Sequence, residues 1–340
     1  MQPGTDPKIS RLSRLSLNLL SLVYKTAACF NLHARSLRRR SFPGMFIISV
    51  DSLSFGGSGK TPLVMAIGRA LQERGARFAV VSRGYRSRRE KTGMRVETAH
   101  TAAEVGDEAL MVKTRFPGQE VFIGRDRLRS IAAAAAMNVR IVILDDGFQS
   151  SHIRKDISIL LVHPGHPYYY LRHFKFMSRR ADLVLSYRPD LRPGGNEAGA
   201  GYDFAISAFL DAGGQPVDIG AASLVAFSAL GDNERFAGDM GRFRLAAFRG
   251  FADHHAFTLA DLRSLEELRR EKGASWLVCT EKDFSKIKSL PVPELRGADP
   301  GERRRFDPRG IPLLYARNEI QLPHGVIAGI IEHAAKKGFI

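Results

Sequence analysis

The fold of this 340-residue chain is decided by the stretch Met45-Phe46-Ile47-Ile48-Ser49-Val50 and the nearby Ser54-Phe55-Gly56-Gly57-Ser58-Gly59-Lys60-Thr61. The apolar run predicts a buried strand, the glycine-rich segment a tight turn, and residues 62–71 a helix. Glycines let backbone N–H groups crowd around phosphate oxygens, and a helix start adds oriented donors. We therefore predict a phosphate-binding loop, in which Lys60 reaches the β- and γ-phosphates and Thr61 binds Mg²⁺.

This loop departs from the usual pattern at one position, because Ser54 stands where the first glycine is expected. A glycine-rich turn alone could merely join a strand to a helix. A Gly-Lys-Thr run between a strand and a helix is much rarer by chance, and it favours nucleotide binding. The predicted phosphate-binding residues are Ser54, Phe55, Gly56, Gly57, Ser58, Gly59, Lys60 and Thr61.

A second candidate follows the β-branched run Val139–Leu144, where the chain reads Asp145-Asp146-Gly147-Phe148-Gln149. Adjacent carboxylates at the end of a buried strand are costly unless cations neutralise them. Asp and Gly also suit a plain β-turn. Because Lys60 and Thr61 lie upstream, we predict that Asp145 and Asp146 help to hold Mg²⁺.

Other polar clusters also follow predicted strands or begin predicted helices. Arg83, within Ser82–Arg86, is placed to contact phosphate or to form a structural turn. Asp107 could cap a helix or act as a general base. The run Phe251–Phe257 contains Asp253, His254 and His255, and Thr280–Asp283 is again charged at a strand end. Neighbouring His side chains on a strand point oppositely, so one metal bound by both is not expected.

Alternating strand-like and helix-like segments predict an α/β fold: a parallel sheet with flanking helices, like that of the P-loop nucleotide hydrolases. We expect three parts: a basic amphipathic segment (1–43), a kinase-like core domain (44–205) and a second, smaller α/β domain (206–340). The division falls near a Pro/Gly-rich stretch at 188–201, and 291–310 is predicted to be a surface loop. The predicted strands are 77–82, 120–123, 139–144, 157–162, 181–186, 223–228, 243–248, 276–279 and 313–316, and the helices are 104–114, 125–137, 259–272 and 326–337.

The net charge of +16 implies polyanionic surroundings, and the cationic residues are concentrated near the N-terminus. Residues 8–40 hold eight Lys or Arg and no acid, with leucines at helical spacing from Leu12 to Leu22. The uncharged part, Leu15–Tyr24, is far shorter than the ~20 residues that span a bilayer. We favour an amphipathic helix on an anionic membrane; a helix docked on the protein's own core and a targeting sequence are the alternatives. Deletion of residues 1–40 is then expected to abolish vesicle binding and to spare ATP binding.

Nucleic-acid binding is not expected, because no nucleic-acid motif accompanies the basic excess. The two cysteines, Cys29 and Cys279, lie far apart and indicate neither a disulfide framework nor a zinc site. No obligate protein partner is evident.

The ordered set of motifs resembles one family, tetraacyldisaccharide 4′-kinase, which acts in lipid A biosynthesis in Gram-negative bacteria. The matching segments are Ser54–Pro62, Ser82–Tyr85, Val105–Glu108, Asp145–Gln149, Ala226–Phe236, Phe251–Phe257 and Thr280–Asp283. The resemblance implies transfer of the γ-phosphate of ATP, with Mg²⁺, to the 4′-hydroxyl of a tetraacylated glucosamine disaccharide 1-phosphate. It also implies a place at the cytoplasmic face of the bacterial inner membrane.

Carried over by position, the resemblance makes Lys60, Asp107 and His254 the catalytic set. It implies that Asp107 accepts the proton of the sugar hydroxyl, with His254 favoured over His255 as its helper. Thr61, Asp145 and Asp146 are implied at the metal. The competing hypothesis is a membrane-recruited nucleotide switch without kinase activity, which would leave Asp107 and His254 without a role.

The most serious of several departures from the family pattern lies near Pro164, where the family usually has a Gly-Pro-Leu-Arg-Glu run. Here only Leu171-Arg172 echoes it, and the residue that follows is His173. This aromatic and basic stretch is interpreted either as a site for acyl chains and the 1-phosphate or as a surface loop at the membrane.

Overall fold

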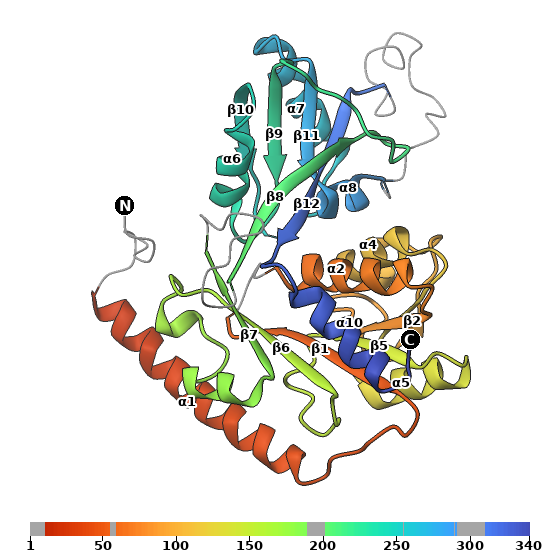
Figure 1. Ribbon diagram of the computed structural model, residues 1–340. Coiled ribbons are helices and arrows are strands. Elements are labelled where there is room, and N and C mark those ends of the chain that lie inside the picture. The colour runs from red at the N-terminus through yellow and green to blue at the C-terminus, as the bar shows by residue number, and fades with distance from the viewer. Residues whose placement is uncertain (1–10, 55–58, 189–200, 254, 289, 291–309) are drawn as a thin grey trace. The chain divides into compact units, whose positions relative to one another are not determined.

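A computed structural model describes the chain except for residues 1–10, 55–58, 189–200, 254, 289 and 291–309 (Figure 1). The chain divides into two compact units, residues 1–204 with 320–340, and residues 205–319. It passes between them in two strands, β8 (Gly201–Leu210) and β12 (Leu313–Gln321). Most of the 291–310 segment, predicted to be a surface loop, and most of the Pro/Gly-rich stretch lie outside the described residues.

The first unit is built on a mostly parallel sheet. Its strand order is β7-β6-β1-β5-β2-β4-β3, and the first residues of β8 pair with the end of β7. Only the short β3 is antiparallel to its neighbour. The strands are β1 (Phe46–Ser52), β2 (Phe78–Ser82), β3 (Met94–Arg95), β4 (Glu120–Ile123), β5 (Ile141–Asp145), β6 (Ile157–Val162) and β7 (Leu183–Tyr187).

Helices cover both faces of this sheet, as expected when parallel strands are buried on both sides. Successive side chains of β1 point to opposite faces, so Phe46 and Ile48 join one core cluster while Ile47 joins the other. The helices of the unit are α1 (Arg11–Ser36), α2 (Lys60–Glu73), α3 (Ala102–Val105), α4 (Asp107–Arg115), α5 (Arg127–Ala136) and α10 (Val326–Lys336), with 3-10 turns η1 (Tyr168–Tyr170) and η2 (Lys175–Arg180).

The C-terminal helix belongs to the first unit. Ile330, Ile331 and Ala334 of α10 are buried in the same cluster as Phe46, and α10 packs against α2. The sequence alone assigned residues 206–340 to the second domain. The apolar face of α10 is satisfied instead by the sheet of the first unit, to which the chain returns through β12.

The strands of the second unit form a section of sheet in the order β10-β9-β11-β12-β8. Two clusters of buried side chains, around Phe227 and Phe236, cover its two faces. Its remaining elements are β9 (Leu224–Ser228), α6 (Asn233–Met240), β10 (Leu245–Gly250), α7 (Leu259–Glu271), β11 (Trp276–Thr280) and α8 (Glu281–Lys288).

Candidate active site

The predicted phosphate loop and the acidic pair meet at one edge of the first sheet. β1 lies beside β5 in parallel, with Val50 opposite Asp145, and the Asp146 N–H donates to the Val50 carbonyl at 3.0 Å. Because parallel strands end at the same edge, the turns after β1 and β5 are neighbours. This edge therefore brings together two motifs that lie about ninety residues apart in the sequence.

The described end of the loop has the geometry of a helix-start anion site. Gly59 is the N-cap of α2, with φ of 84°, which favours glycine. A Cβ there would lie 2.2 Å from the Phe204 ring, so space as well as conformation demands glycine. Lys60 and Thr61 follow as the first helical residues, and Thr61 is buried. Phe55, Gly56, Gly57 and Ser58 lie outside the described residues.

Asp146 is the point at which two cations converge. Its carboxylate lies 3.9 Å from the Lys60 ammonium and 2.5 Å from the Arg172 guanidinium. Burial alone would raise the pKa of Asp146, but Lys60 and Arg172 together outweigh it and lower that pKa. Its φ of 58° is in the left-handed region, which is unusual for a residue with a side chain. Asp146 is therefore an ionised carboxylate held in a demanding backbone conformation.

Asp145 is buried beside it in a different state. Its Oδ1 has no hydrogen-bond partner among the residues that the structure describes. Burial first, and then the charge of Glu108, raise the pKa of Asp145 to about 7. An unpaired buried carboxylate oxygen is unfavourable by itself and favourable next to a cation.

These residues fit a magnesium ion. Mg²⁺ in nucleotide sites usually takes one or two protein ligands and completes its shell with water and phosphate oxygens. Asp145, Asp146 and the Thr61 hydroxyl supply that kind of donor set. Within the described ranges no group of three or more His, Cys, Asp or Glu is placed to hold a metal ion.

Two further charged residues in this cluster were not predicted from the sequence. Asp51, near the end of β1, is buried and accepts hydrogen bonds from the N–H groups of Ser52 (2.7 Å) and Phe148. Burial and the neighbouring Asp146 raise its pKa to about 6. Arg127 starts α5 and donates to the Gly124 carbonyl and to the Asp145 carbonyl. An acid within the buried, mostly apolar run Phe46–Ser52 was the feature of the sequence that could have indicated Asp51.

Arg172 comes from the stretch that departs from the family pattern. Its backbone N–H donates to the Leu53 carbonyl at 2.8 Å, and Leu171 forms an isolated bridge with Ser54. The stretch therefore lies along the start of the phosphate loop and places a guanidinium on Asp146. Neither sequence interpretation, acyl-chain site or surface loop, anticipated this contribution.

Asp107 is the first residue of α4, and Gly106 (φ 91°) before it interrupts the helical conformation between α3 and α4. A Cβ at Gly106 would lie 3.6 Å from Gly84, so this break packs against the turn after β2. The next residue, Glu108, acts electrostatically on Asp145. Glu108, in the first turn of α4, is therefore close enough to Asp145 to affect its charge. In the turn after β2, Arg83 is paired with Glu90 at 2.6 Å.

The Asp-His-His segment belongs to the second unit, and His254 lies outside the described residues. His255 is engaged by the start of α7, with its Nε2 3.1 Å from Asp261 Oδ2. Asp261 also forms the capping box of α7 with Thr258. The nearby Asp283 is fully buried, accepts from Ala229 N–H and Thr280 Oγ1, and is paired with Lys286. His255 and Asp283 therefore have structural partners within this unit.

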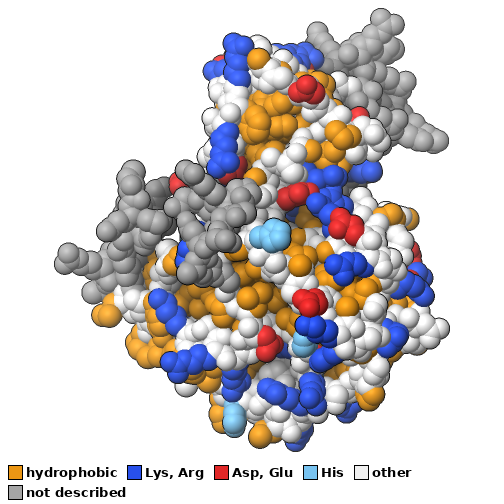
Figure 2. Space-filling model, viewed as in Figure 1, with side chains coloured by type: hydrophobic (Ala, Val, Ile, Leu, Met, Phe, Trp, Pro, Cys, Tyr) orange, Lys and Arg blue, Asp and Glu red, His pale blue; other side chains and the backbone are white. Residues whose placement is uncertain are grey.

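Helix α1 docks on the first unit through its polar side. Ser21, Lys25 and Leu32 are buried, while apolar side chains on the other side of the helix are exposed. Figure 2 shows hydrophobic side chains gathered over this helix. The exposed apolar residues of the segment are Leu15, Leu17, Leu19, Leu20, Leu22, Val23, Tyr24, Phe30 and Leu37. The sequence placed the cations of this helix outward; Lys25 instead faces the protein. Across the described residues, no helix has the length and apolarity to cross a bilayer.

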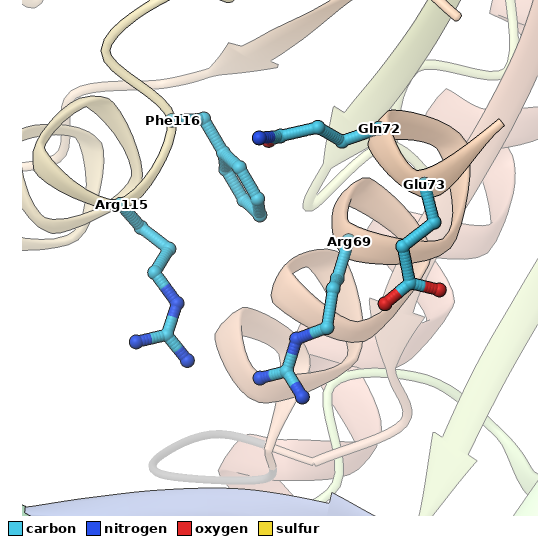
Figure 3. Close-up of a pocket in the computed structure, with 5 residues that line it drawn as sticks. All are labelled: Arg69, Gln72, Glu73, Arg115 and Phe116. Carbon is cyan, nitrogen blue, oxygen red and sulfur yellow. The ribbon is translucent and has the colours of Figure 1, made fainter. Parts of the chain in front are cut away.

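A groove of about 410 Å³ lies elsewhere on this unit, between the ends of α2 and α4 (Figure 3). Its lining is Arg69, Gln72, Glu73, Arg115 and Phe116. It sits about three turns along α2 from Lys60, roughly 15 Å at the rise of an α-helix. The groove is therefore separate from the sheet edge that carries Lys60 and the acidic pair.

Comparisons with known proteins agree with this geometry. Residues 13–298 match the LpxK family, described as Tetraacyldisaccharide-1-P 4'-kinase. The chain is 33% identical to the tetraacyldisaccharide 4′-kinase of Nitrobacter winogradskyi, over 82% of this chain and 85% of that protein. It is 32% identical to the one from Bradyrhizobium sp. (strain ORS 278), over 80% and 83% of the two chains.

Among solved structures, LpxK from Aquifex aeolicus, in complex with ATP, has a TM-score of 0.72 and 23% identity. The match covers 95% of this chain and 98% of that one, and it establishes the shared fold. The family match spans most of the chain and includes the phosphate loop, the Asp145–Asp146 pair and Arg172. The chain therefore belongs to the tetraacyldisaccharide-1-phosphate 4′-kinase family.

Proposed function

We propose that this protein transfers the γ-phosphate of ATP to the 4′-hydroxyl of a tetraacylated glucosamine disaccharide 1-phosphate. Membership of the family and the names of its relatives support the acceptor, and the relative from Aquifex aeolicus was solved with ATP. The observation that carries the proposal is the cluster of Lys60, Asp146 and Arg172 beside Asp145, whose Oδ1 has no hydrogen-bond partner among the described residues.

The described residues suit the donor half of the reaction. Phosphoryl transfer depends on positioning and on cations that stabilise charge on the transferred group. Lys60 is held at the start of α2 by its contact with Asp146, within reach of phosphate oxygens at the helix N-terminus. Bound Mg²⁺ supplies further charge neutralisation, with Thr61, Asp145 and Asp146 as its protein ligands. Arg172 keeps Asp146 ionised and oriented for that task.

Asp107 is proposed as the general base of the acceptor half, with His254 as its helper. Its place in the first turn of α4 supports this role, because helix-anchored residues hold a fixed geometry. The pairing of His255 with Asp261 supports His254 as the histidine available for chemistry.

The surface of α1 supports a membrane location. The exposed leucines, Val23 and Phe30 form an apolar surface on a helix that is flanked by exposed Arg38, Arg39 and Arg40. Such a helix inserts its apolar side among lipid acyl chains while nearby cations contact anionic headgroups. We place the protein on the cytoplasmic face of the bacterial inner membrane, where ATP and an acylated acceptor meet.

The test is an assay with purified protein, ATP, Mg²⁺ and the tetraacyl disaccharide 1-phosphate in mixed micelles. Transfer of γ-phosphate to the acceptor is expected, and Lys60→Ala is expected to lower its rate about 10³-fold. Nucleotide hydrolysis without transfer would support a nucleotide switch instead. Absence of transfer, in micelles where a kinase of the same family works, would reject the proposal.

A further inference from the structure

The buried face of α1 contains a charged side chain with a specific set of contacts. Lys25 is fully buried, and its ammonium donates to the Tyr168 carbonyl at 2.6 Å. The same ammonium lies 3.1 Å from the centre of the Tyr168 ring. Burial lowers the pKa of Lys25 to about 8, so the cation persists at neutral pH. A buried lysine is costly unless such partners hold it.

The carbonyl bound by Lys25 lies in the turn that delivers Arg172. Tyr168 belongs to η1, and its carbonyl also accepts the Leu171 N–H at 3.1 Å. The next residue, Arg172, donates to Asp146 with its side chain and to Leu53 with its backbone. One short chain segment thus links the Lys25 ammonium to the carboxylate beside Lys60. Figure 1 shows α1 running alongside the yellow-green turns that contain this segment.

A second set of contacts joins α1 to the same scaffold. Leu32 packs in one buried cluster with five residues, three of which are close in sequence to a functional group: Leu53, Phe148 and Leu171. Leu53 precedes the phosphate loop, Phe148 follows the acidic pair, and Leu171 precedes Arg172. The Ser151 hydroxyl donates to the Leu32 carbonyl at 2.7 Å. The inner face of α1 therefore supports the loops that carry the site.

We propose that Lys25 is a positioning residue for phosphoryl transfer: its ammonium fixes the Tyr168–Leu171 turn so that the Arg172 guanidinium stays on Asp146. This inference rests on the proposed kinase function and assigns α1 a second task beyond any membrane contact. It also changes the expectation for deletion of residues 1–40. Since that deletion removes Lys25 and Leu32, nucleotide binding and turnover are expected to fall along with vesicle binding.

The test compares Lys25→Met with Thr26→Ala, a neighbouring exposed position whose hydroxyl bonds only within its own helix at Leu22. Initial rates are measured in mixed micelles, where membrane anchoring does not limit the reaction. Lys25→Met is expected to lower kcat about 10- to 100-fold, because small misplacements of charged groups have effects of this size. The KM for the acceptor is expected to change less than about 3-fold, and vesicle binding to persist, because the outer face is intact.

A double-mutant cycle separates positioning from general destabilisation. If Lys25 acts through Arg172, adding Lys25→Met to Arg172→Met lowers kcat by less than about 2-fold further. Multiplicative effects of the two substitutions would overturn the inference. If thermal melting shows that Lys25→Met does not fold, Tyr168→Leu is tested in its place. This variant retains the Tyr168 carbonyl and removes the ring that contacts the ammonium. Its kcat is expected to fall about 3-fold or more.

A folded Lys25→Met, or in its place Tyr168→Leu, with the kcat of Thr26→Ala overturns the inference and leaves the proposed function standing. Absence of transfer by the unmodified protein overturns both.

Discussion

The edge of the sheet around Asp146 and the outer face of α1 break the ordinary rule of burial in opposite directions. The first buries Asp51, Asp145 and Arg127 among apolar strands. The second leaves Leu15 70% exposed and Phe30 75% exposed. Folding alone favours the reverse in both places, since charges prefer water and large apolar side chains prefer the core.

This contrast in burial indicates what each region binds. The charged edge holds buried charges of both signs, and Asp145 Oδ1 has no hydrogen-bond partner among the described residues. Such a site suits a ligand that brings its own charge, such as a metal-bound nucleotide. Exposed leucines on a helix that is already docked through its other side suit an apolar phase rather than a protein core.

The largest effect is expected at the charged edge. Asp145→Asn removes the charge of a buried carboxylate whose Oδ1 is unpaired, and a ligand of the proposed metal with it. Transfer is expected to slow about 10³-fold, while the free energy of unfolding without nucleotide rises by about 1–3 kcal/mol. Rates and thermal melts of the same preparation measure both. Loss of activity together with loss of stability would contradict the view that this charge serves a ligand. Glu73→Gln, an exposed acid on α2, is the matched control.

The two sides of α1 give the next comparison. Leu32→Ala, on the inner side, is expected to destabilise the protein by about 2–5 kcal/mol, as for other buried leucines. Phe30→Ala, on the outer side, is expected to change the free energy of unfolding by less than about 0.5 kcal/mol. Urea unfolding measures each value. Equal destabilisation by the two variants would show that the outer side is buried in solution.

The outer side alone is tested by Leu19→Ser with Val23→Ser. Both side chains are more than 60% exposed, so melting temperature should stay nearly unchanged. Partitioning onto anionic vesicles should weaken about 10- to 100-fold, because two apolar side chains no longer enter the lipid. Co-sedimentation over a range of lipid concentrations measures it. Binding unaffected by this change and abolished by salt would mean that the cations act alone.

The smallest effect is a pH dependence that originates next to Arg172. His173 is buried against Phe148, and burial, followed by the charge of Arg172, lowers its pKa to about 4. Between pH 6.5 and 4 the unfolded chain binds a proton that the folded chain does not, so stability falls as pH falls. From pH 7 to pH 5 this group should remove on the order of 2 kcal/mol of stability.

His173→Asn should abolish that part of the acid sensitivity in urea unfolding at the two pH values. His33→Asn, at an exposed position on α1, should keep the slope of the unmodified protein. An unchanged slope in His173→Asn would show that another group causes the acid sensitivity.

Much of the first unit was predictable because local pattern and burial agree there. The run Phe46–Val50 is apolar except for Ser49, as expected for a strand buried on both faces, and the structure has every residue of β1 buried. The predicted strand 120–123 and helix 259–272 also lie where the structure has β4 and α7. Strand β8 was not predicted, because it begins within the Pro/Gly-rich stretch that reads as a linker.

Within the site, what could be foreseen depended on motif strength. Lys60, Thr61, Asp145 and Asp146 sit in short motifs whose residue types are set by phosphate and metal chemistry. Arg172 had only the short Leu171-Arg172 echo of the family pattern, and only the fold shows that it reaches Asp146. Which side of α1 faces the protein was also hidden, because a helical wheel separates apolar from polar residues without saying which side meets water, lipid or protein.

The alternation of strands and helices, the phosphate loop and the acidic pair are readable from the chain alone, because each is encoded by neighbouring residues. The folded protein was needed to show that Asp51 and Arg172 join that pair, that α10 returns to the first unit, and that Lys25 faces inward. These are contacts between segments far apart in the chain, such as the 143 residues between Lys25 and Tyr168. These contacts form only when the sheet and the helices pack together, so they cannot be predicted from the residues that are neighbours in sequence.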